Sequence, residues 1–320
     1  MKAAVVSSFD SAPRYQDFPV PVPSGDDEVL VDVLAAGLHP RVRSQADGSH
    51  YTSNGALPLV PGVDGVGRGP DGLLRYFVLP DTTMGAMAEQ TVIDIRRSIV
   101  LPEGTDPVTV AAAMNPAMSS WVALRQRVSF QAGQDVLVLG ATGSAGQMAV
   151  QVAKRLGARQ IIAAGRDTGR LAALPALGAT ATVPLGAATG TSSGAGRLAK
   201  AAADVDVVLD FLWGQPAADA MIAIITSRAD RSQPLSWIQI GSVAGPTAEI
   251  PSAALRAARL QLVGSGQGSV STREYLAELN VLAQEIAAGT IDVDARPVPL
   301  AHVEEAWAAT DAKHRTVLVP

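Results

Sequence analysis

Hydrophobic residues follow two different patterns along this chain of 320 residues. In the N-terminal part, short apolar runs at 2–6, 28–34, 73–79 and 87–93 are separated by clusters of proline and glycine. Short runs between turn-forming residues are typical of β-strands. The N-terminal part of the chain is therefore expected to be rich in β-strands.

From about residue 106, patterns typical of helices and of strands alternate. A long alanine-rich helical pattern covers 107–130, and further helices are expected at 145–156, 168–176 and 215–226. Strands are expected at 135–139, 160–164, 180–183, 205–210, 235–240 and 259–263, and the stretch 186–196 is predicted to be a surface loop. Strands that alternate with helices form right-handed crossovers and a parallel sheet, so this part predicts an α/β fold.

The end of the chain returns to isolated elements, with helices expected at 272–288 and 301–310 and a strand at 315–319. A chain of this length exceeds one ordinary domain. Two domains are therefore expected.

Composition excludes several kinds of function. The net charge is −5 and no dense run of Lys or Arg occurs, so no nucleic-acid partner is expected. The absence of cysteine removes disulfides, thiolate nucleophiles, cysteine-based zinc sites and iron–sulfur clusters. The N-terminus lacks the pattern of a secretory signal and no apolar run is long enough to cross a bilayer, so a cytoplasmic protein without a membrane partner is expected.

A glycine-rich turn carries the sharpest chemical signal. A buried strand is expected to run into Gly140, and Gly143 and Gly146 follow before a helix. Glycines permit a tight turn and a close approach to a pyrophosphate, and the helix N-terminus offers free N–H groups. The usual fingerprint is G-x-G-x-x-G, and Ala141 stands here in the place of its first glycine. An ordinary strand–helix turn that needs glycines is the alternative.

The next expected strand ends at Gly165 and Arg166, where an acidic residue would bind the ribose 2′-hydroxyl of NAD. Arg170 follows one helical turn later. A guanidinium pairs with a phosphate through two hydrogen bonds, so these residues favour the 2′-phosphate of NADP(H) over NAD(H). Two roles stay open for Asp167, which could pair with Arg170 or cap the next helix.

Further segments resemble the motifs of one family. They are the early strand at 27–37, the Pro-Gly-x-Asp-x-x-Gly turn at 61–67, the strand at 87–92, the helix at 111–124 and the C-terminal segments 306–307 and 316–319. Together with the glycine turn, they resemble the zinc-free, quinone oxidoreductase-like branch of the medium-chain dehydrogenase/reductase superfamily over essentially the whole chain.

This resemblance implies a fold and a set of contacts. It implies a GroES-like, β-rich catalytic domain made of 1–115 and 266–320, a Rossmann domain that binds NADP(H) at 116–265, and a homodimer. The residues expected to line the cofactor are Asn115, Ser119, Gly140, Ala141, Thr142, Gly143, Ser144, Ala145, Gly146, Gly165, Arg166, Arg170, Phe211, Leu212, Gly241, Ser242, Val243, Gly264, Ser265 and Gly266. Trp213 is either part of this set or hydrophobic cover.

Two residues are candidates for a catalytic hydrogen-bond donor. The resemblance places Tyr51 on a loop that borders the substrate, where its hydroxyl could donate to a carbonyl or could serve packing alone. His39 falls near the position of the first zinc ligand in metal-dependent relatives, and a polar loop residue is its alternative role. One histidine and Asp64 without a second soft donor make a poor zinc site, so no metal is expected.

These features predict an NADPH-dependent, metal-independent oxidoreductase that transfers a hydride to a quinone, an enone or a similar activated carbonyl compound. A carbonyl or alcohol oxidoreductase of the same superfamily is the nearest alternative. An NADPH-binding structural or regulatory protein with weak catalysis is the second.

Overall fold

The computed structural model of the chain describes residues 1–80, 82–186, 193–266, 268–309 and 314–320. The described residues form two compact units. Unit 1 contains Met1–Asn115 and Leu276–Pro320, and unit 2 contains Pro116–Tyr275. The predicted nucleotide-binding domain ends at 265, whereas unit 2 extends to Tyr275, so residues 266–275 belong to unit 2 and not to the unit that was predicted for them.

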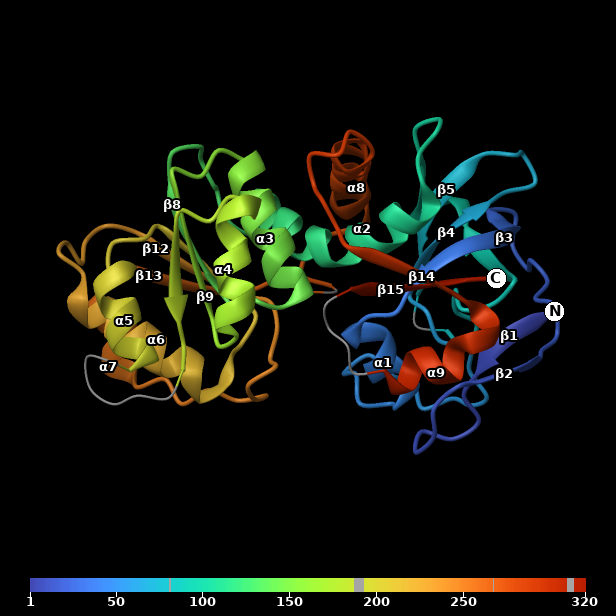
Figure 1. The fold of residues 1–320 in the computed structure, drawn as a ribbon, viewed down its shortest axis with the longest axis horizontal. Coiled ribbons are helices and arrows are strands. Elements are labelled where there is room, and N and C mark those ends of the chain that lie inside the picture. The colour runs from blue at the N-terminus through green and yellow to red at the C-terminus, as the bar shows by residue number, and fades with distance from the viewer. Residues whose placement is uncertain (81, 187–192, 267, 310–313) are drawn as a thin grey trace. The chain divides into compact units, whose positions relative to one another are not determined.

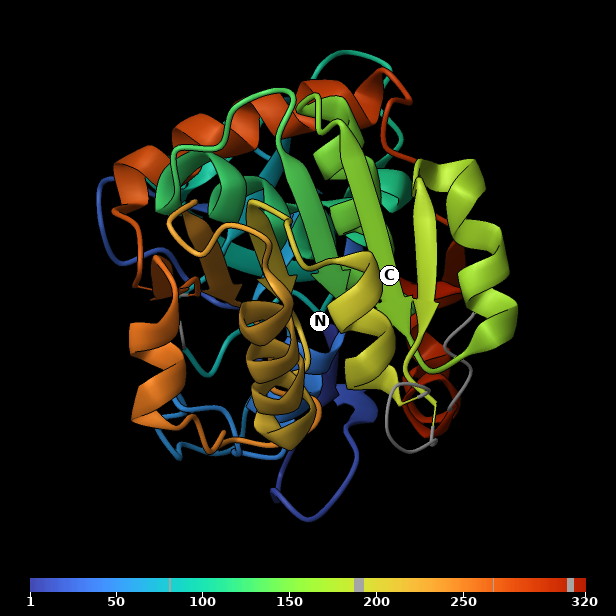
Figure 2. The same cartoon turned by 90° about the vertical axis from the view of Figure 1, so that its left-hand side faces the viewer.

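Unit 2 is built on a parallel sheet that has six strands within the described residues (Figure 2). In sheet order they are β10 (Ala181–Pro184), β9 (Gln160–Gly165), β8 (Asp135–Leu139), β11 (Val207–Asp210), β12 (Leu235–Gln239) and β13 (Leu260–Gly264). The chain runs from β8 outward to β10 and then continues on the other side of β8 with β11. This order confirms the predicted α/β class and puts the reversal of the sheet between β8 and β11.

Helices cover both faces of this sheet. Figure 1 shows α3 (Ser144–Arg155) and α4 (Thr168–Leu177) on one side of the strands, and α5 (Gly194–Ala201) and α6 (Gly214–Ser227) on the other. The central strands β8 and β11 are therefore buried along their whole length, as their near-continuous apolar runs predict. A short helix, α7 (Ser252–Ala257), precedes the edge strand β13.

Two predicted boundaries differ from the structure. The helix expected at 107–130 is α2 (Pro107–Val122), which continues as a π-helical turn, η2 (Ala123–Arg127), before the backbone becomes extended at Val128. Helix α5 begins inside the stretch predicted as a loop, because the hydroxyl of Ser193 accepts a hydrogen bond from the amide of Gly196 and caps the helix. Residues 187–192 of that predicted loop lie outside the described residues.

Unit 1 is rich in strands, as its pattern predicts. A pair of antiparallel strands, β1 (Lys2–Val5) and β2 (Arg14–Asp17), stands beside a larger sheet. The larger sheet has the order β14 (Ala295–Pro299), β15 (Arg315–Val319), β3 (Glu28–Gly37), β4 (Asp64–Arg68), β5 (Leu74–Val78) and β7 (Ser98–Val100), and β6 (Gln90–Asp94) also pairs with β3. Both ends of the chain therefore build this unit, because β15 pairs with β3.

Two long helices connect the units, since α2 begins in unit 1 and ends in unit 2, and α8 (Thr272–Ala287) begins in unit 2 and ends in unit 1. The other helices among the described residues of unit 1 are short: α1 (Pro40–Ala46), α9 (Val303–Ala308) and the 3-10 turns η1 (Ile95–Arg97) and η4 (Leu300–His302). The strand expected at 87–93 starts only at Gln90, because Ala88 makes an isolated bridge to Ala3 instead. In the described ranges, no helix is both long and apolar enough to span a bilayer.

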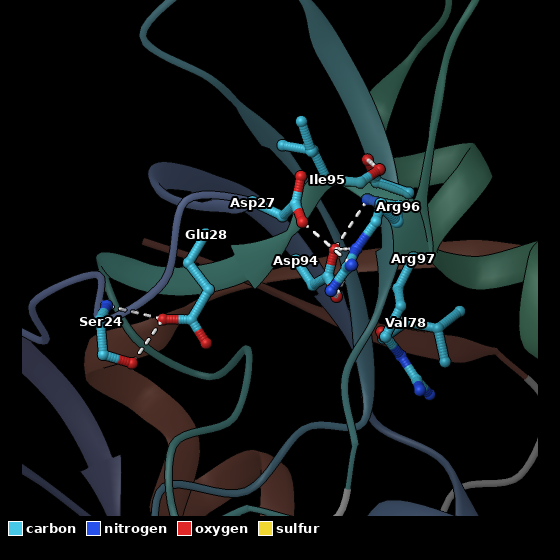
Figure 3. Close-up of polar contacts among 9 residues, drawn as sticks. Ser24, Asp27, Glu28, Val78, Asp94, Ile95, Arg96 and Arg97 are labelled. Atoms are coloured by element: carbon cyan, nitrogen blue, oxygen red, sulfur yellow. Dashed lines mark hydrogen bonds and ion pairs between the residues drawn. The ribbon is translucent and has the colours of Figure 1, made fainter.

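Charged residues close one end of the β3–β6 pair at the surface (Figure 3). Arg96 forms ion pairs with Asp27 at 2.9 Å and with Asp94 at 2.7 Å. The amide and the hydroxyl of Ser24 both donate to the carboxylate of Glu28, and these hydrogen bonds hold the pKa of Glu28 below its usual value. Exposed pairs of this kind contribute little stability each, so they mark the start of β3 and the end of β6 rather than a site.

Candidate functional site

The chain makes a tight turn where β8 leads into α3. Gly140 adopts a φ angle of +88°, a conformation that side chains other than glycine rarely adopt. The amides of Gly140 and Ala141 both donate to the carbonyl of Ala164, at 2.9 Å each. The turn is thereby fixed to the end of β9, at the reversal of the sheet where parallel α/β folds bind ligands.

Two glycines allow backbone segments to pack closely around this turn. A Cβ atom on Gly146 would lie 2.3 Å from the carbonyl oxygen of Gly140, so α3 can approach the turn only with glycine there. A Cβ atom on Gly165 would lie 2.5 Å from Cγ2 of Thr142. The absence of a side chain at these two positions therefore leaves room for the backbone of the turn at Gly146 and for the side chain of Thr142 at Gly165, which is the packing role of glycine in a dinucleotide-binding turn.

Gly143 has different surroundings. The only heavy atom of a described residue within 4 Å of an added Cβ would be the carbonyl oxygen of Gly140, at 3.6 Å. Gly143 is also the N-cap residue of α3, and no side chain caps this helix. The first amides of a helix have no partner within it, so this open, uncapped N-terminus, with Ser144 and Ala145 in its first turn, fits an anionic group such as a diphosphate.

Two arginines follow the end of β9. Arg166 is exposed and has no ion pair within the described part of the chain. Arg170 donates from Nη1 to the carbonyl of Thr142 in the glycine turn, at 3.2 Å. Asp167 accepts from the amide of Arg170 at 3.0 Å as the cap of α4, and its carboxylate lies 3.5 Å from Nε of Arg170. Both roles left open for Asp167 are therefore observed together, and Arg170 is held beside the turn.

The loop that follows β11 lies against the glycine turn. Cδ2 of Leu212 and Cβ of Phe211 would each lie 3.2 Å from a Cβ atom on Gly140. Phe211 is buried and Leu212 is half-buried. The carbonyl of Leu212 accepts from the amide of Ala244 at 2.8 Å, so the loops after β8, β11 and β12 meet at the carboxyl ends of their strands.

The loop after β12 contains three predicted residues. Gly241 packs on backbone, because a Cβ atom there would lie 2.9 Å from the carbonyl oxygen of Phe211. Ser242 is exposed, and Val243 is 77% exposed. A single exposed apolar side chain is ordinary at a protein surface, so the exposure of Val243 does not by itself indicate a ligand contact.

Arg127 fixes the segment after β13, although no motif in the sequence singles it out. It donates from Nε to the carbonyl of Gly264 and from Nη1 to the carbonyl of Ser269, at 2.9 Å each. Gly266 and Ser269 also bond to each other, and the amide of Ser265 donates to the end of β12. Arg127 therefore holds the two ends of this segment, whereas Ser265 is held by β12 and Gly266 by Ser269.

Asn115 and Ser119 both lie on α2, four residues apart and so on one face of the helix. Asn115 is half-buried and is the last residue of the first segment of unit 1. The hydroxyl of Ser119 donates to the carbonyl of Pro116 at 2.8 Å.

His39, the N-cap residue of α1, lies in a buried polar cluster of unit 1. Its Nε2 is 2.9 Å from Oδ1 of Asp64, and the hydroxyl of Tyr76 donates to Oδ2 of Asp64 at 2.7 Å. All three residues are buried. A carboxylate only accepts hydrogen bonds, so the neutral ring carries its proton on Nε2 and offers Nδ1 as an acceptor.

Positive charges also surround His39. The amide of Leu38 donates to the carbonyl of Thr316, which brings Arg315 beside His39 across the β3–β15 pair. Burial lowers the pKa of Arg315 to about 10, against the opposing effect of Asp64. Burial lowers the pKa of His39 as well, and the charges of Arg315 and Arg41 act in the same direction. His39 is therefore a poor proton donor at neutral pH.

Tyr51 lies between α1 and β4 and is 73% exposed. Its ring packs on the ring of His50, with the centroids 4.3 Å apart. No group of three His, Cys, Asp or Glu side chains that could hold a metal ion occurs among the residues that the structure describes.

No protein-family model matches the chain. The chain is 30% identical to a probable NADPH-dependent quinone reductase of Emericella nidulans, and the alignment covers 100% of both proteins. It is 28% identical to a 2-methylene-furan-3-one reductase of Solanum lycopersicum over 48% of this chain and 44% of that protein. The quinone oxidoreductase of Thermus thermophilus, solved also in complex with NADPH, is 25% identical with a TM-score of 0.80 and 100% coverage of both chains.

The fold and the first of these relatives agree with the motifs that the sequence carries. The structural similarity extends over both units, and the glycine turn lies at the expected reversal of the sheet. Because the relative from Emericella nidulans aligns over its whole length, the chain belongs to the quinone oxidoreductase-like branch of the medium-chain dehydrogenase/reductase superfamily.

Proposed function

We propose that this chain is an NADPH-dependent oxidoreductase that transfers a hydride to a quinone, an enone or a similar activated carbonyl compound. The observation that carries this proposal is the uncapped N-terminus of α3 with Arg166 and Arg170 beside its turn. A helix N-terminus suits a diphosphate, and a guanidinium suits the additional ribose phosphate that distinguishes NADPH from NADH.

The names of two relatives support the choice of substrate class. One is a probable NADPH-dependent quinone reductase and the other a 2-methylene-furan-3-one reductase. Bound NADPH would supply the hydride and both of its electrons. The chain itself would hold the dinucleotide at the glycine turn and the loops after β9, β11, β12 and β13, orient it, and keep water from the reacting atoms.

Hydride addition to a quinone or enone places negative charge on the substrate oxygen. We propose Tyr51 as the hydrogen-bond donor to that oxygen, because its phenolic hydroxyl can donate to an oxygen that gains negative charge. His39 is the second candidate. It could donate at Nδ1 only as the imidazolium, since Asp64 already takes the proton on Nε2.

We propose that the activity needs no metal. The chain has no cysteine, and the only pairing of His39 within the described residues is with Asp64. A zinc ion in a protein needs at least three ligands from Cys, His, Asp or Glu side chains.

We further propose a homodimer. Strand β13 forms the edge of the parallel sheet, and Leu262 on it is 38% exposed. An edge strand with exposed apolar side chains is a ready surface for pairing with another chain. Light scattering coupled to size exclusion should give about twice the chain mass of 32.9 kDa, and the mass of a single chain would exclude the dimer.

Steady-state consumption of NADPH with a panel of quinones, enones and aldehydes tests the proposed function. We expect turnover with quinones or enones and little with simple aldehydes. Turnover with aldehydes alone would favour the carbonyl oxidoreductase alternative. NADPH binding without turnover of any compound would favour the binding-protein alternative.

A further inference from the structure

One buried carboxylate in unit 2 joins the loops around the glycine turn, although no cofactor contact was predicted for it. Asp210 ends β11 and is completely buried. Its Oδ1 accepts from the backbone amides of Leu212 at 2.8 Å and of Trp213 at 2.9 Å. Its Oδ2 accepts from Nε1 of Trp237 on the neighbouring strand β12, at 3.0 Å.

The loop that Asp210 holds is strained. Trp213 is the only residue other than glycine with a positive φ angle in the described part of the chain, at 52°, and Gly214 follows with 64°. Such a conformation costs free energy and persists only where the surrounding structure imposes it. The two backbone hydrogen bonds to Asp210, together with the bond between Ala244 and Leu212, impose it here.

The conformation of this loop determines which side chains lie against the glycine turn. Leu212 contacts the turn beside Gly140, and Phe211 packs against Gly241 in the loop after β12. The backbone carbonyl of Asp210 also accepts from the amide of Gly241, at 3.1 Å. A change at Asp210 would therefore displace side chains on both sides of the strand ends where a dinucleotide binds.

We propose that Asp210 is a positioning residue for the dinucleotide, acting through the loop Phe211–Leu212–Trp213 and anchored by Trp237. This inference rests on the proposed function, because it needs NADPH to bind at the glycine turn. Asp210 touches no cofactor itself. It fixes the backbone of the loop that does, and the indole of Trp237 fixes the orientation of its carboxylate.

The test uses the full-length protein and the variant Asp210→Asn. In either orientation the amide group of asparagine sets an NH₂ group against at least one N–H donor, because all three neighbours donate. We expect the Kd and KM for NADPH to rise by roughly tenfold, because binding must then restore the loop conformation that Asp210 imposes in the wild type, while kcat at saturating NADPH changes little.

A second substitution makes the test independent of a general loss of folding. Trp237→Phe removes the indole donor together with part of a buried ring, so this single variant is the reference for the loss of packing. The double variant Asp210→Asn with Trp237→Phe can keep Oδ1 on the two backbone amides, and its NH₂ group then faces no donor. NADPH affinity in the double variant should recover toward that of Trp237→Phe alone. A role in folding alone would change the melting temperature without this recovery of affinity.

Asp206→Asn is the matched control. Asp206 precedes the other end of the same strand, where its Oδ2 accepts from the amide of Asp135 at 2.8 Å. This variant should lose some stability and keep its NADPH affinity. Unchanged NADPH affinity in Asp210→Asn would overturn the positioning role, whereas a wild-type protein that binds no NADPH would overturn the proposed function instead.

Discussion

Gly143 and Gly146 lie close together in the sequence, but their surroundings indicate different roles, in binding for Gly143 and in packing for Gly146. A side chain at Gly146 would meet the carbonyl oxygen of Gly140 at 2.3 Å, whereas one at Gly143 would meet the same atom only at 3.6 Å. Gly143 also has an ordinary φ angle of −80°. The backbone needs glycine at position 146 for packing, and the dinucleotide would need it at position 143.

The variant Gly143→Val should therefore fold and fail to bind NADPH. A branched side chain there would point into the proposed path of the diphosphate, and its Cβ atom would meet no described residue other than its chain neighbours closer than 3.6 Å. We expect a melting temperature close to that of the wild type and a large loss of affinity in calorimetric titration. Gly146→Val serves as the contrast, since it should lower the melting temperature strongly. An unchanged NADPH affinity in Gly143→Val would place the nucleotide elsewhere.

The proposed role of Tyr51 as a hydrogen-bond donor has the least structural support, because this side chain is exposed and belongs to unit 1, away from the glycine turn of unit 2 in the sequence. If its hydroxyl donates to the substrate oxygen, Tyr51→Phe should lower kcat by about ten- to a thousandfold, the larger value being the effect of a lost oxyanion donor. NADPH affinity should stay the same. Tyr15→Phe, whose ring faces Lys2, is the control and should leave kcat unchanged. Equal rates for the wild type and Tyr51→Phe would remove the donor role.

At the scale of elements, the sequence was informative where a strand runs into a helix and much less so elsewhere. The parallel strands and the glycine turn follow from continuous apolar runs and from glycine spacing, which are local signals. Strands β2, β4, β7 and β14 were missed, because short strands of mixed polarity owe their pairing to neighbours far along the chain.

The buried cluster around His39 was missed for the same reason. Its members come from the start of α1 and from β4, β5 and β15, and no spacing in the sequence shows that Asp64, Tyr76 and Arg315 meet there. Asp210 offered one weak signal, an acidic residue at the end of a buried strand. Such clusters depend on the register of the sheet, which one sequence does not reveal.

The buried cluster around His39 predicts a pH dependence of stability. The pKa of His39 is lowered in the folded protein by burial and by Arg315 and Arg41, so the unfolded chain binds more protons just below its ordinary pKa of about 6.5. The free energy of unfolding should therefore fall as the pH drops below about 6.5, by up to about 1.4 kcal/mol per pH unit from this group.

Denaturant unfolding of the wild type and of His39→Gln at several pH values checks this prediction. The glutamine amide can still donate to Asp64 but does not titrate. We expect a shallower pH dependence in the variant, with the other three histidines contributing equally to both proteins. Identical slopes would show that His39 keeps an ordinary pKa.

At the scale of the whole molecule, the proposed function assigns the chemistry to the dinucleotide and to oriented side chains, without a metal. Exhaustive dialysis against a chelator should therefore leave the rate of NADPH consumption unchanged, and elemental analysis should find no stoichiometric zinc. The absence of cysteine and the pairing of His39 with Asp64 are the physical reasons. Loss of activity together with one bound zinc per chain would contradict this assignment.

The fold of unit 2 follows from the strand–helix alternation of its sequence, whereas the pairing of β15 with β3, which brings both chain ends into unit 1, is an observation of the structure. The central claim for the molecule is that the strand end at Arg166 recognises the phosphate that distinguishes NADPH from NADH. Calorimetric titration of NADPH and NADH into the wild type and into Arg166→Ala tests it most directly. We expect the wild type to prefer NADPH, and the substitution to weaken NADPH by about ten- to a hundredfold while NADH affinity hardly changes. Equal affinity of the wild type for both dinucleotides would contradict the account.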